Sequence, residues 1–301
     1  MGVSPARAPI FDAYIMVDWS AAAVPRRGKD SIWYSVLARR NGRLRRLVLE
    51  NPPTRAQAEA DLTHRLAALQ RRGDRVLVGF DFPFGYPSGT AARLGITGLP
   101  WRHFWQELDD SIEDGPDNRN NRFDVAEALN RRLTGEAFPF WGDVREDGRP
   151  YLRRRDRRAH GRDDLAERRL CELRIRSTQP VWKLAGAGSV GSQSLMGIPR
   201  VWRIRRDPRL ANACHIWPFE TGLRYDPRPQ IQLAEVYPSL VPAPPLKGKP
   251  KDAAQVVAIA RHFAVLDDAG DLQALFAGDP ALTPLERRCI ESEEAWILGV
   301  P

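Results

Sequence analysis

RVLVGFDFPFGYP, at residues 75–87, predicts a strand followed by a turn, with a carboxylate at their junction. Its first half, 76–80, is a short apolar run with branched side chains, which predicts a buried strand. Two prolines and a glycine follow closely, so neither strand nor helix continues past Asp81. Asp81 is therefore expected where the chain leaves the sheet, at the edge where open α/β sheets bind ligands.

A second segment has the same construction. Residues 13–19, AYIMVDW, predict an apolar strand that ends near Asp18. Two strand-like runs follow, at 31–38 and 44–50, and the Asn-Gly pair between them is typical of a hairpin turn. The first half of the chain thus begins with three successive antiparallel strands.

A predicted helix brings the two aspartates together. Residues 54–71 repeat leucines at helical spacing behind a capping-box pattern. A right-handed crossover through this helix returns the next strand parallel to the first. Neighbouring strands lie about 5 Å apart, so we expect Asp18 and Asp81 to share one divalent cation.

Two further acids follow in the second half of the chain. The strand-like run 231–238 carries Glu235, and Asp252 begins a helix with one apolar face. Taken singly, each of the four carboxylates also has a structural explanation, as a turn cap, a first-turn acid or an edge charge. The paired aspartates at strand ends favour a metal site.

Several short segments, in this order, resemble the domain of unknown function 429 family, predicted nucleases of the ribonuclease H-like superfamily. The matching segments are MVDWS at 16–20, VGFDFPFGYP at 78–87, AEVYPS at 234–239, KDAAQV at 251–256 and EEAWILGV at 293–300. They leave the middle of the chain largely unmatched. The resemblance implies acidic metal ligands at Asp18, Asp81, Glu235 and Asp252, although no further acid stands in the three residues after Asp252.

The strand order and the resemblance together predict a ribonuclease H-like α/β fold. Its mixed sheet has three antiparallel strands, then a parallel strand after a crossover helix, with helices flanking it. Residues 13–87 and 230–300 are expected to form the two parts of the core. Residues 88–229 are expected to form a large, mainly helical and arginine-rich insertion or cap, with a charged helix in the arginine tract at 149–176.

Such a site predicts hydrolysis of phosphodiester bonds with Mg²⁺ or Mn²⁺ as cofactor. Two ions about 4 Å apart position the attacking water and neutralise the phosphoryl oxygens. Hard cations of this kind take oxygen ligands. We expect Asp18 to bridge both ions, Asp81 and Glu235 to hold one, and Asp252 to hold the other.

The charge of the chain indicates a phosphate-bearing partner, nucleic acid or nucleotide. The formal net charge is +8, and the arginine tract holds eleven arginines against five acids. A nucleic-acid face and a merely solvated surface explain this tract equally well. The sequence does not indicate an oligomeric state.

A glycine-rich segment offers other functions. The GxGxxG match at 186–191 lacks a suitable helix, because Gly197 and Pro199 are expected to cut it short, so a dinucleotide site is not favoured. A phosphate-cradling loop remains open. The candidate phosphate-binding residues are Lys183, Gly186, Gly188, Ser189, Gly191 and Lys251. The alternatives are therefore a nucleotide-binding or phosphotransfer protein of the same fold, or a non-catalytic nucleic-acid-binding protein.

Ser189 also stands in AGSVG, close to the GxSxG nucleophile elbow. An esterase would require His215 or His262 within hydrogen-bond reach of its hydroxyl.

Composition excludes several classes of protein. With 301 residues, 43% of them hydrophobic, the chain can bury a full core. No run approaches the roughly 18 apolar residues of a membrane span, and residues 1–12 lack the apolar core of a secretory signal. Three widely spaced cysteines favour neither disulfides nor a thiolate zinc site. We expect a soluble, cytoplasmic protein.

Overall fold

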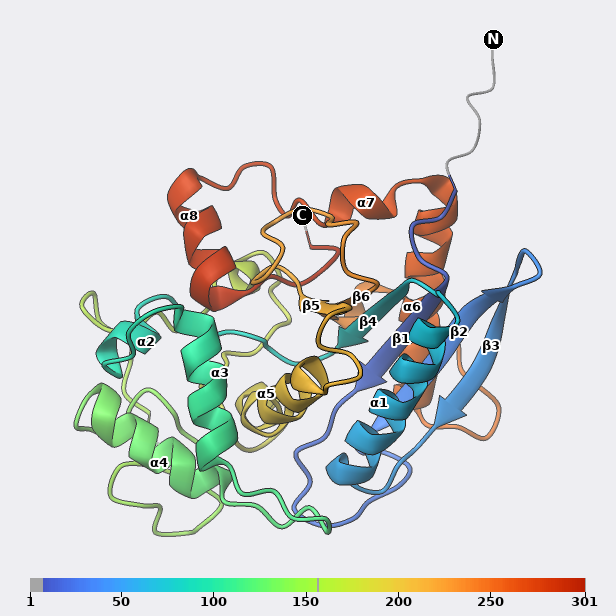
Figure 1. Ribbon diagram of the computed structural model, residues 1–301. Helices are drawn as coiled ribbons and strands as arrows, with labels where there is room; N and C mark the ends of the chain where they lie inside the picture. Colours follow the sequence, from blue (N-terminus) through green and yellow to red (C-terminus); the bar gives the residue numbers. More distant parts are fainter. Residues whose placement is uncertain (1–7, 156, 301) are drawn as a thin grey trace.

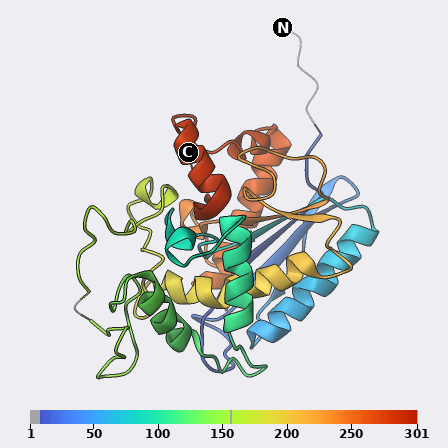
Figure 2. The same cartoon turned by 60° about the vertical axis from the view of Figure 1, so that its left-hand side comes forward.

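The computed structural model describes residues 8–155 and 157–300. A six-stranded mixed sheet, in the order β3-β2-β1-β4-β6-β5, runs through it with helices on both faces (Figures 1 and 2). β1, β2 and β3 pair antiparallel, and β4, β6 and β5 run parallel to β1. The predicted α/β class and the mixed sheet are confirmed. The strands are β1 (Ala13–Asp18), β2 (Trp33–Arg40), β3 (Arg43–Glu50), β4 (Val76–Phe80), β5 (Cys214–Ile216) and β6 (Ile231–Glu235).

Helices cover the sheet and extend beyond one side of it (Figure 1). The helices are α1 (Arg55–Arg71), α2 (Thr90–Arg93), α3 (Pro100–Ser111), α4 (Arg122–Leu133), α5 (Val190–Arg206), α6 (Lys251–Ala269), α7 (Leu272–Leu275) and α8 (Pro284–Cys289). Short 3-10 turns occupy Cys171–Leu173 and Pro238–Leu240, and a π-helical turn, Ile290–Glu294, follows α8. No helix among the described residues is long and apolar enough to cross a membrane.

Alternating side chains along β1 build two cores. Ile15 and Val17 pack in the core that contains α1 and α5, whereas Tyr14 and Met16 pack in the core that contains α6. Burial on both faces is typical of strands at the centre of an α/β sheet. β1 is therefore fixed from both sides where it approaches Asp18.

Local signals in the first half of the chain act as expected. Asn41 and Gly42 have φ of 52° and 70°, as a two-residue hairpin turn requires. The Thr54 side chain accepts the backbone N–H of Gln57, and α1 begins at Arg55.

Residues 88–229 contribute to the sheet as well as to its cover. β5 extends the sheet beside β6, and α5 packs in the core on the same face as α1. α2, α3 and α4 lie to one side of the sheet, away from β2 and β3 (Figure 1). This segment therefore supplies α5, which packs in the same core as α1 and reaches the end of β1.

The prediction of a charged helix in the arginine tract is wrong. Of the described residues between 149 and 176, only Cys171–Leu173 form a helical turn. Charges support a helix when opposite signs stand three or four residues apart. Arg158 instead pairs with Asp164, six residues on, and with Glu136. These ion pairs connect loop residues and do not join successive turns of a helix.

The expectation that Gly197 and Pro199 would end the helix is also wrong, because α5 continues through both to Arg206. Pro199 removes one helix hydrogen bond, but nearly every residue from Gly191 to Ile204 is buried. Gly197 is needed for a close approach. A Cβ atom there would lie 2.3 Å from the ring of Phe82, in the turn after Asp81.

This contact reverses the usual effect of a glycine-to-alanine change in a helix. On propensity alone, Gly197→Ala would stabilise the protein by up to about 1 kcal/mol. We expect it instead to lower the free energy of unfolding by about 1–3 kcal/mol, because the added methyl overpacks against Phe82. Urea denaturation of the single variant, of Phe82→Leu and of the double variant measures the coupling. A stabilised Gly197→Ala protein would contradict the contact.

Candidate functional site

Parallel pairing sets Asp18 and Asp81 beside each other. Val17 is in register with Phe80, so the two aspartates follow at the same level. The Trp19 backbone N–H donates to Asp81 Oδ1 at 2.7 Å, and the Asp81 N–H donates to the carbonyl of Val17 at 3.2 Å. These bonds fix the Asp81 carboxylate across the end of β1.

Burial and like charge control the ionisation of this pair. Burial, reinforced by the charges of Asp81 and Asp252, raises the pKa of Asp18 well above its ordinary value. Burial likewise raises the pKa of Asp81 to about 7, although the Trp19 N–H opposes this rise. Near neutral pH the two side chains therefore retain a proton unless a cation compensates their charge.

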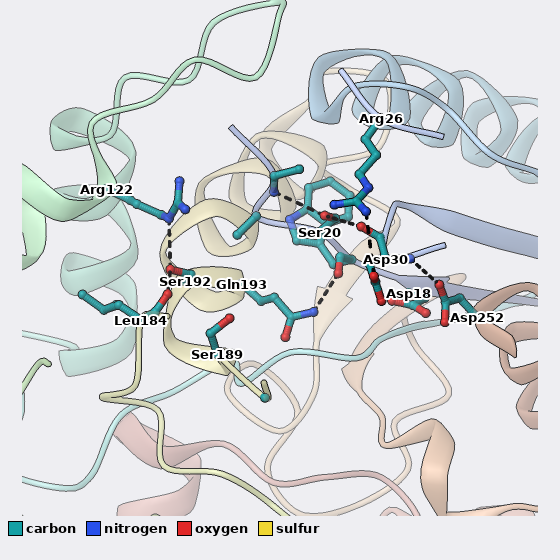
Figure 3. A pocket seen from close by; sticks show the side chains of 14 residues that line it. Asp18, Ser20, Arg26, Asp30, Arg122, Leu184, Ser189, Ser192, Gln193 and Asp252 are labelled. Atoms are coloured by element: carbon teal, nitrogen blue, oxygen red, sulfur yellow. Dashed lines mark hydrogen bonds and ion pairs between the residues drawn. The ribbon is translucent and has the colours of Figure 1, made fainter. Parts of the chain in front are cut away.

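Asp252 brings a third carboxylate from the first turn of α6. Its Oδ2 accepts the backbone N–H of Asp30 at 2.8 Å, and its charge raises the pKa of both Asp18 and Asp81. Figure 3 shows the Asp18, Asp30 and Asp252 side chains gathered on one side of the site. Asp30 is absent from the sequence prediction, because no strand or helix pattern marks its turn.

Glu235 lines a cavity with Asp81, but it is paired with Arg169 and is absent from the pocket lined by Asp18 and Asp252. Its carboxylate is buried, and both oxygens accept hydrogen bonds from Arg169, at 2.6 and 2.8 Å. One of them also accepts the backbone N–H of Phe84 at 2.9 Å. The expected ligand set of four carboxylates around two ions is therefore not formed, because Arg169 compensates the charge of Glu235.

Arg169 connects segments that are distant in the sequence. Its buried guanidinium also donates to Glu172 at 2.9 Å and to the backbone carbonyl of Glu294 at 2.9 Å. It thereby ties β6 to the C-terminal segment. Arg169 is one of eleven similar arginines between residues 149 and 176, and nothing in the local sequence pattern distinguishes the buried one.

The acids of the EEAWILGV segment serve the turn after Asp81. Glu293 accepts the backbone N–H of Gly89 at 2.8 Å, and Glu294 accepts that of Ser88 at 2.9 Å. A Cβ atom at Gly85 would lie 2.3 Å from the Glu293 carbonyl oxygen, so the two segments touch closely. These carboxylates position the turn and do not face Asp18.

The glycine-rich loop approaches the carboxylates from α5. Gly186 and Gly188 have φ of 85° and 69°, and Ser189 directly precedes the first residue of α5. Gly188 and Ser189 line the same pocket as Asp18. Gly191 has a packing role, because a Cβ atom there would lie 2.2 Å from a backbone carbonyl.

The two candidate lysines do not line this pocket. Lys183 Nζ donates to the carbonyl of Ala187 at 2.5 Å and to the side chain of Gln179 at 3.3 Å, so it braces the glycine-rich loop. Lys251 is exposed at the first residue of α6.

An esterase site is not formed in the part of the chain that the structure describes. There, the histidine rings that form hydrogen bonds are those of His103 and His160, and each is bonded to a backbone carbonyl. Ser189 therefore has no histidine base.

An open pocket of about 390 Å³ is lined by Asp18, Asp30 and Asp252 (Figure 3), whereas Asp81 lines a second cavity with Glu235 and Arg169. In the open pocket, carboxylates occupy one side, Ser189 and Gln193 lie along its middle, and Arg122 lies on the opposite side. Gln193 Nε2 donates to the carbonyl of Trp19 at 2.7 Å, which ties α5 to the end of β1. Arg122 is a further residue that sequence reasoning missed. We refer to this feature as the strand-end pocket.

The carboxylates at the ends of β1 and β4 suit a hard cation. Within 8–155 and 157–300, no group of three or more His, Cys, Asp or Glu side chains is arranged to hold a metal ion. In the same residues, no lysine or arginine forms an ion pair with Asp18, Asp81 or Asp252. Mg²⁺ commonly uses one or two carboxylates together with water and a substrate phosphate. Asp18 and Asp81 match that smaller requirement.

Comparison of the chain with protein-family models, with curated proteins and with solved structures finds no match.

The Arg169–Glu235 pair predicts a loss of stability without a loss of metal affinity. Glu235→Gln is expected to lower the free energy of unfolding by about 3–5 kcal/mol, because it leaves Arg169 buried without its main counter-charge. Urea denaturation measures this change. Calorimetry with Mn²⁺ is expected to give an unchanged affinity, and a large loss of affinity in a folded variant would return Glu235 to the metal site.

The raised pKa of Asp81 predicts a pH-dependent stability. An unfolded aspartate has a pKa near 3.9, so between about pH 4 and pH 7 the folded chain binds the additional proton. The free energy of unfolding contributed by this group therefore falls as pH rises through that window.

We expect Asp81→Asn to gain stability relative to wild type on going from pH 5 to pH 8, measured by urea denaturation with a chelator present. Asp147→Asn, at an exposed carboxylate, is the control. If the stability difference between Asp81→Asn and wild type is the same at pH 5 and pH 8, the raised pKa of Asp81 is contradicted.

Proposed function

We propose that the chain is a divalent-metal-dependent nuclease or phosphodiesterase of ribonuclease H-like fold. The observation that supports it most strongly is the placement of Asp18 and Asp81 at the ends of two adjacent parallel strands, with Asp252 near enough to raise the pKa of both. A bound cation would favour the ionised form of these carboxylates. The order of three antiparallel strands followed by a parallel one also supports the proposal.

Each of these residues has a separate task in this proposal. Asp18 and Asp81 hold Mg²⁺ or Mn²⁺, and the Trp19 N–H keeps Asp81 oriented for it. A bound ion of this kind neutralises phosphoryl oxygens and lowers the pKa of a water molecule. Asp252, held by the Asp30 N–H, adds negative charge that favours cation binding.

The glycine-rich loop orients the phosphate in the same proposal. Gly188 and Ser189 lie on the wall of the pocket, where backbone N–H groups and a hydroxyl suit phosphate oxygens. This placement also supports the second candidate, a nucleotide-binding or phosphotransfer protein. The two candidates differ in the reaction they predict, because only the first hydrolyses a polynucleotide, with water as the acceptor.

The proposal predicts that metal binding and cleavage are lost together. For Asp18→Asn combined with Asp81→Asn, we expect Mn²⁺ affinity at pH 8 to fall at least about tenfold, because charged oxygen ligands are removed. Cleavage of single-stranded and double-stranded DNA and RNA is expected to fall by at least about a hundredfold. Calorimetry and gel assays on the same samples measure both.

The matched control is Glu146→Gln combined with Asp147→Asn, which removes two exposed carboxylates far from the pocket lining. It is expected to behave as wild type. Unchanged Mn²⁺ binding in the Asp18 and Asp81 variant would refute the metal site. Retained binding of Mn²⁺ by wild type with no cleavage of any polynucleotide would favour the second candidate.

A further inference from the structure

Arg122 stands at the start of α4 and lines the strand-end pocket opposite the carboxylates (Figure 3). Two of its nitrogens are fixed by the protein. Nε donates to Ser192 Oγ at 3.0 Å, and Nη1 donates to Asn120 Oδ1 at 2.7 Å. Its guanidinium carbon lies 4.4 Å from the centre of the Phe123 ring. The side chain is therefore held in place by neutral groups.

The charge of Arg122 is only partly offset by its surroundings, through Asp114. Arg55 and Arg200 both pair with Asp114, at 2.6 and 2.9 Å, and Arg200 also pairs with Glu59. Asp114 is thus already shared by two arginines, and within the described residues Arg122 makes no ion pair of its own.

An unpaired, partly buried cation is costly to the fold. Burial and the charge of Arg55 accordingly lower the pKa of Arg122 to about 10, so it remains protonated at neutral pH. Its Nη2 group donates no hydrogen bond to any of the described residues. One edge of the guanidinium is therefore free to bind a ligand. An anion bound in the pocket would supply a counter-charge.

We propose that Arg122 binds a second phosphate of the substrate, next to the one held at Asp18 and Asp81. The inference rests on the proposed function and narrows its substrate class. A ligand that reaches from the carboxylate side to Arg122 carries at least two phosphates in one chain, as an oligonucleotide does. Arginine suits this task because its planar fork donates to phosphate oxygens in pairs.

The test compares Arg122→Gln with wild type on short single-stranded oligonucleotides. In one series each phosphodiester in turn is replaced by an uncharged methylphosphonate. Binding is measured by fluorescence anisotropy with Ca²⁺ in place of Mn²⁺, and cleavage is assayed separately with Mn²⁺. Arg119→Gln is the matched control, because Arg119 lies in the same segment, its side chain is 89% exposed, and it does not line the pocket.

We expect Arg122→Gln to weaken binding of the all-phosphate oligonucleotide by about tenfold, the loss of one charge-assisted contact. That loss is expected to vanish for the one oligonucleotide whose neutral linkage faces Arg122, and Arg119→Gln is expected to bind as wild type. Arg122→Lys, which keeps the charge without the fork, is expected to recover part of the affinity.

Equal binding by wild type and Arg122→Gln overturns the inference. So does a uniform loss across every methylphosphonate position, which indicates a structural role, and so does a wild-type protein that binds no oligonucleotide. If wild type cleaves the oligonucleotide and Arg122→Gln binds it as well as wild type does, this inference alone is refuted. If Arg122→Gln weakens binding but wild type does not cleave, the proposed hydrolysis alone is refuted.

Discussion

The parallel pairing of β1 with β4 is the constraint on which the site depends. Each strand is apolar to its end and then terminates in a carboxylate, so correct burial of both strands forces Asp18 and Asp81 together. Packing of the two cores thus holds two carboxylates close together, although their like charges repel each other. A cation that relieved this repulsion would stabilise the folded state.

A second buried network keeps the turn after Asp81 in place. Arg169 joins Glu235, the backbone of Glu294 and, through Glu235, the Phe84 N–H. Glu293 and Glu294 then bind backbone groups further along the turn. Charges in this protein therefore divide by environment: Glu235 is matched by Arg169, whereas Asp18 and Asp81 form no ion pair with a lysine or arginine among the described residues.

The sequence predicts those parts of the fold and site that depend on local patterns. Apolar runs with terminal aspartates locate β1 and β4, and the Asn41-Gly42 turn and the Thr54 cap locate the hairpin and α1. Contacts between distant segments escape such reasoning. The partner of Glu235 lies 66 residues away, and α5 tolerates Pro199 only because of tertiary burial. Arg122 likewise reaches the pocket through the packing of α4, which no local pattern reveals.

The most direct test of this account is the position of the cation itself. Crystals grown with Mn²⁺ near pH 8 and measured at a wavelength with strong manganese anomalous scattering would locate it without any assumption about catalysis. The account predicts an anomalous peak in contact with Asp18 and Asp81, while Glu235 stays paired with Arg169. A peak bound by Glu235, or an occupied manganese site elsewhere with the two aspartates still sharing a proton, would contradict it.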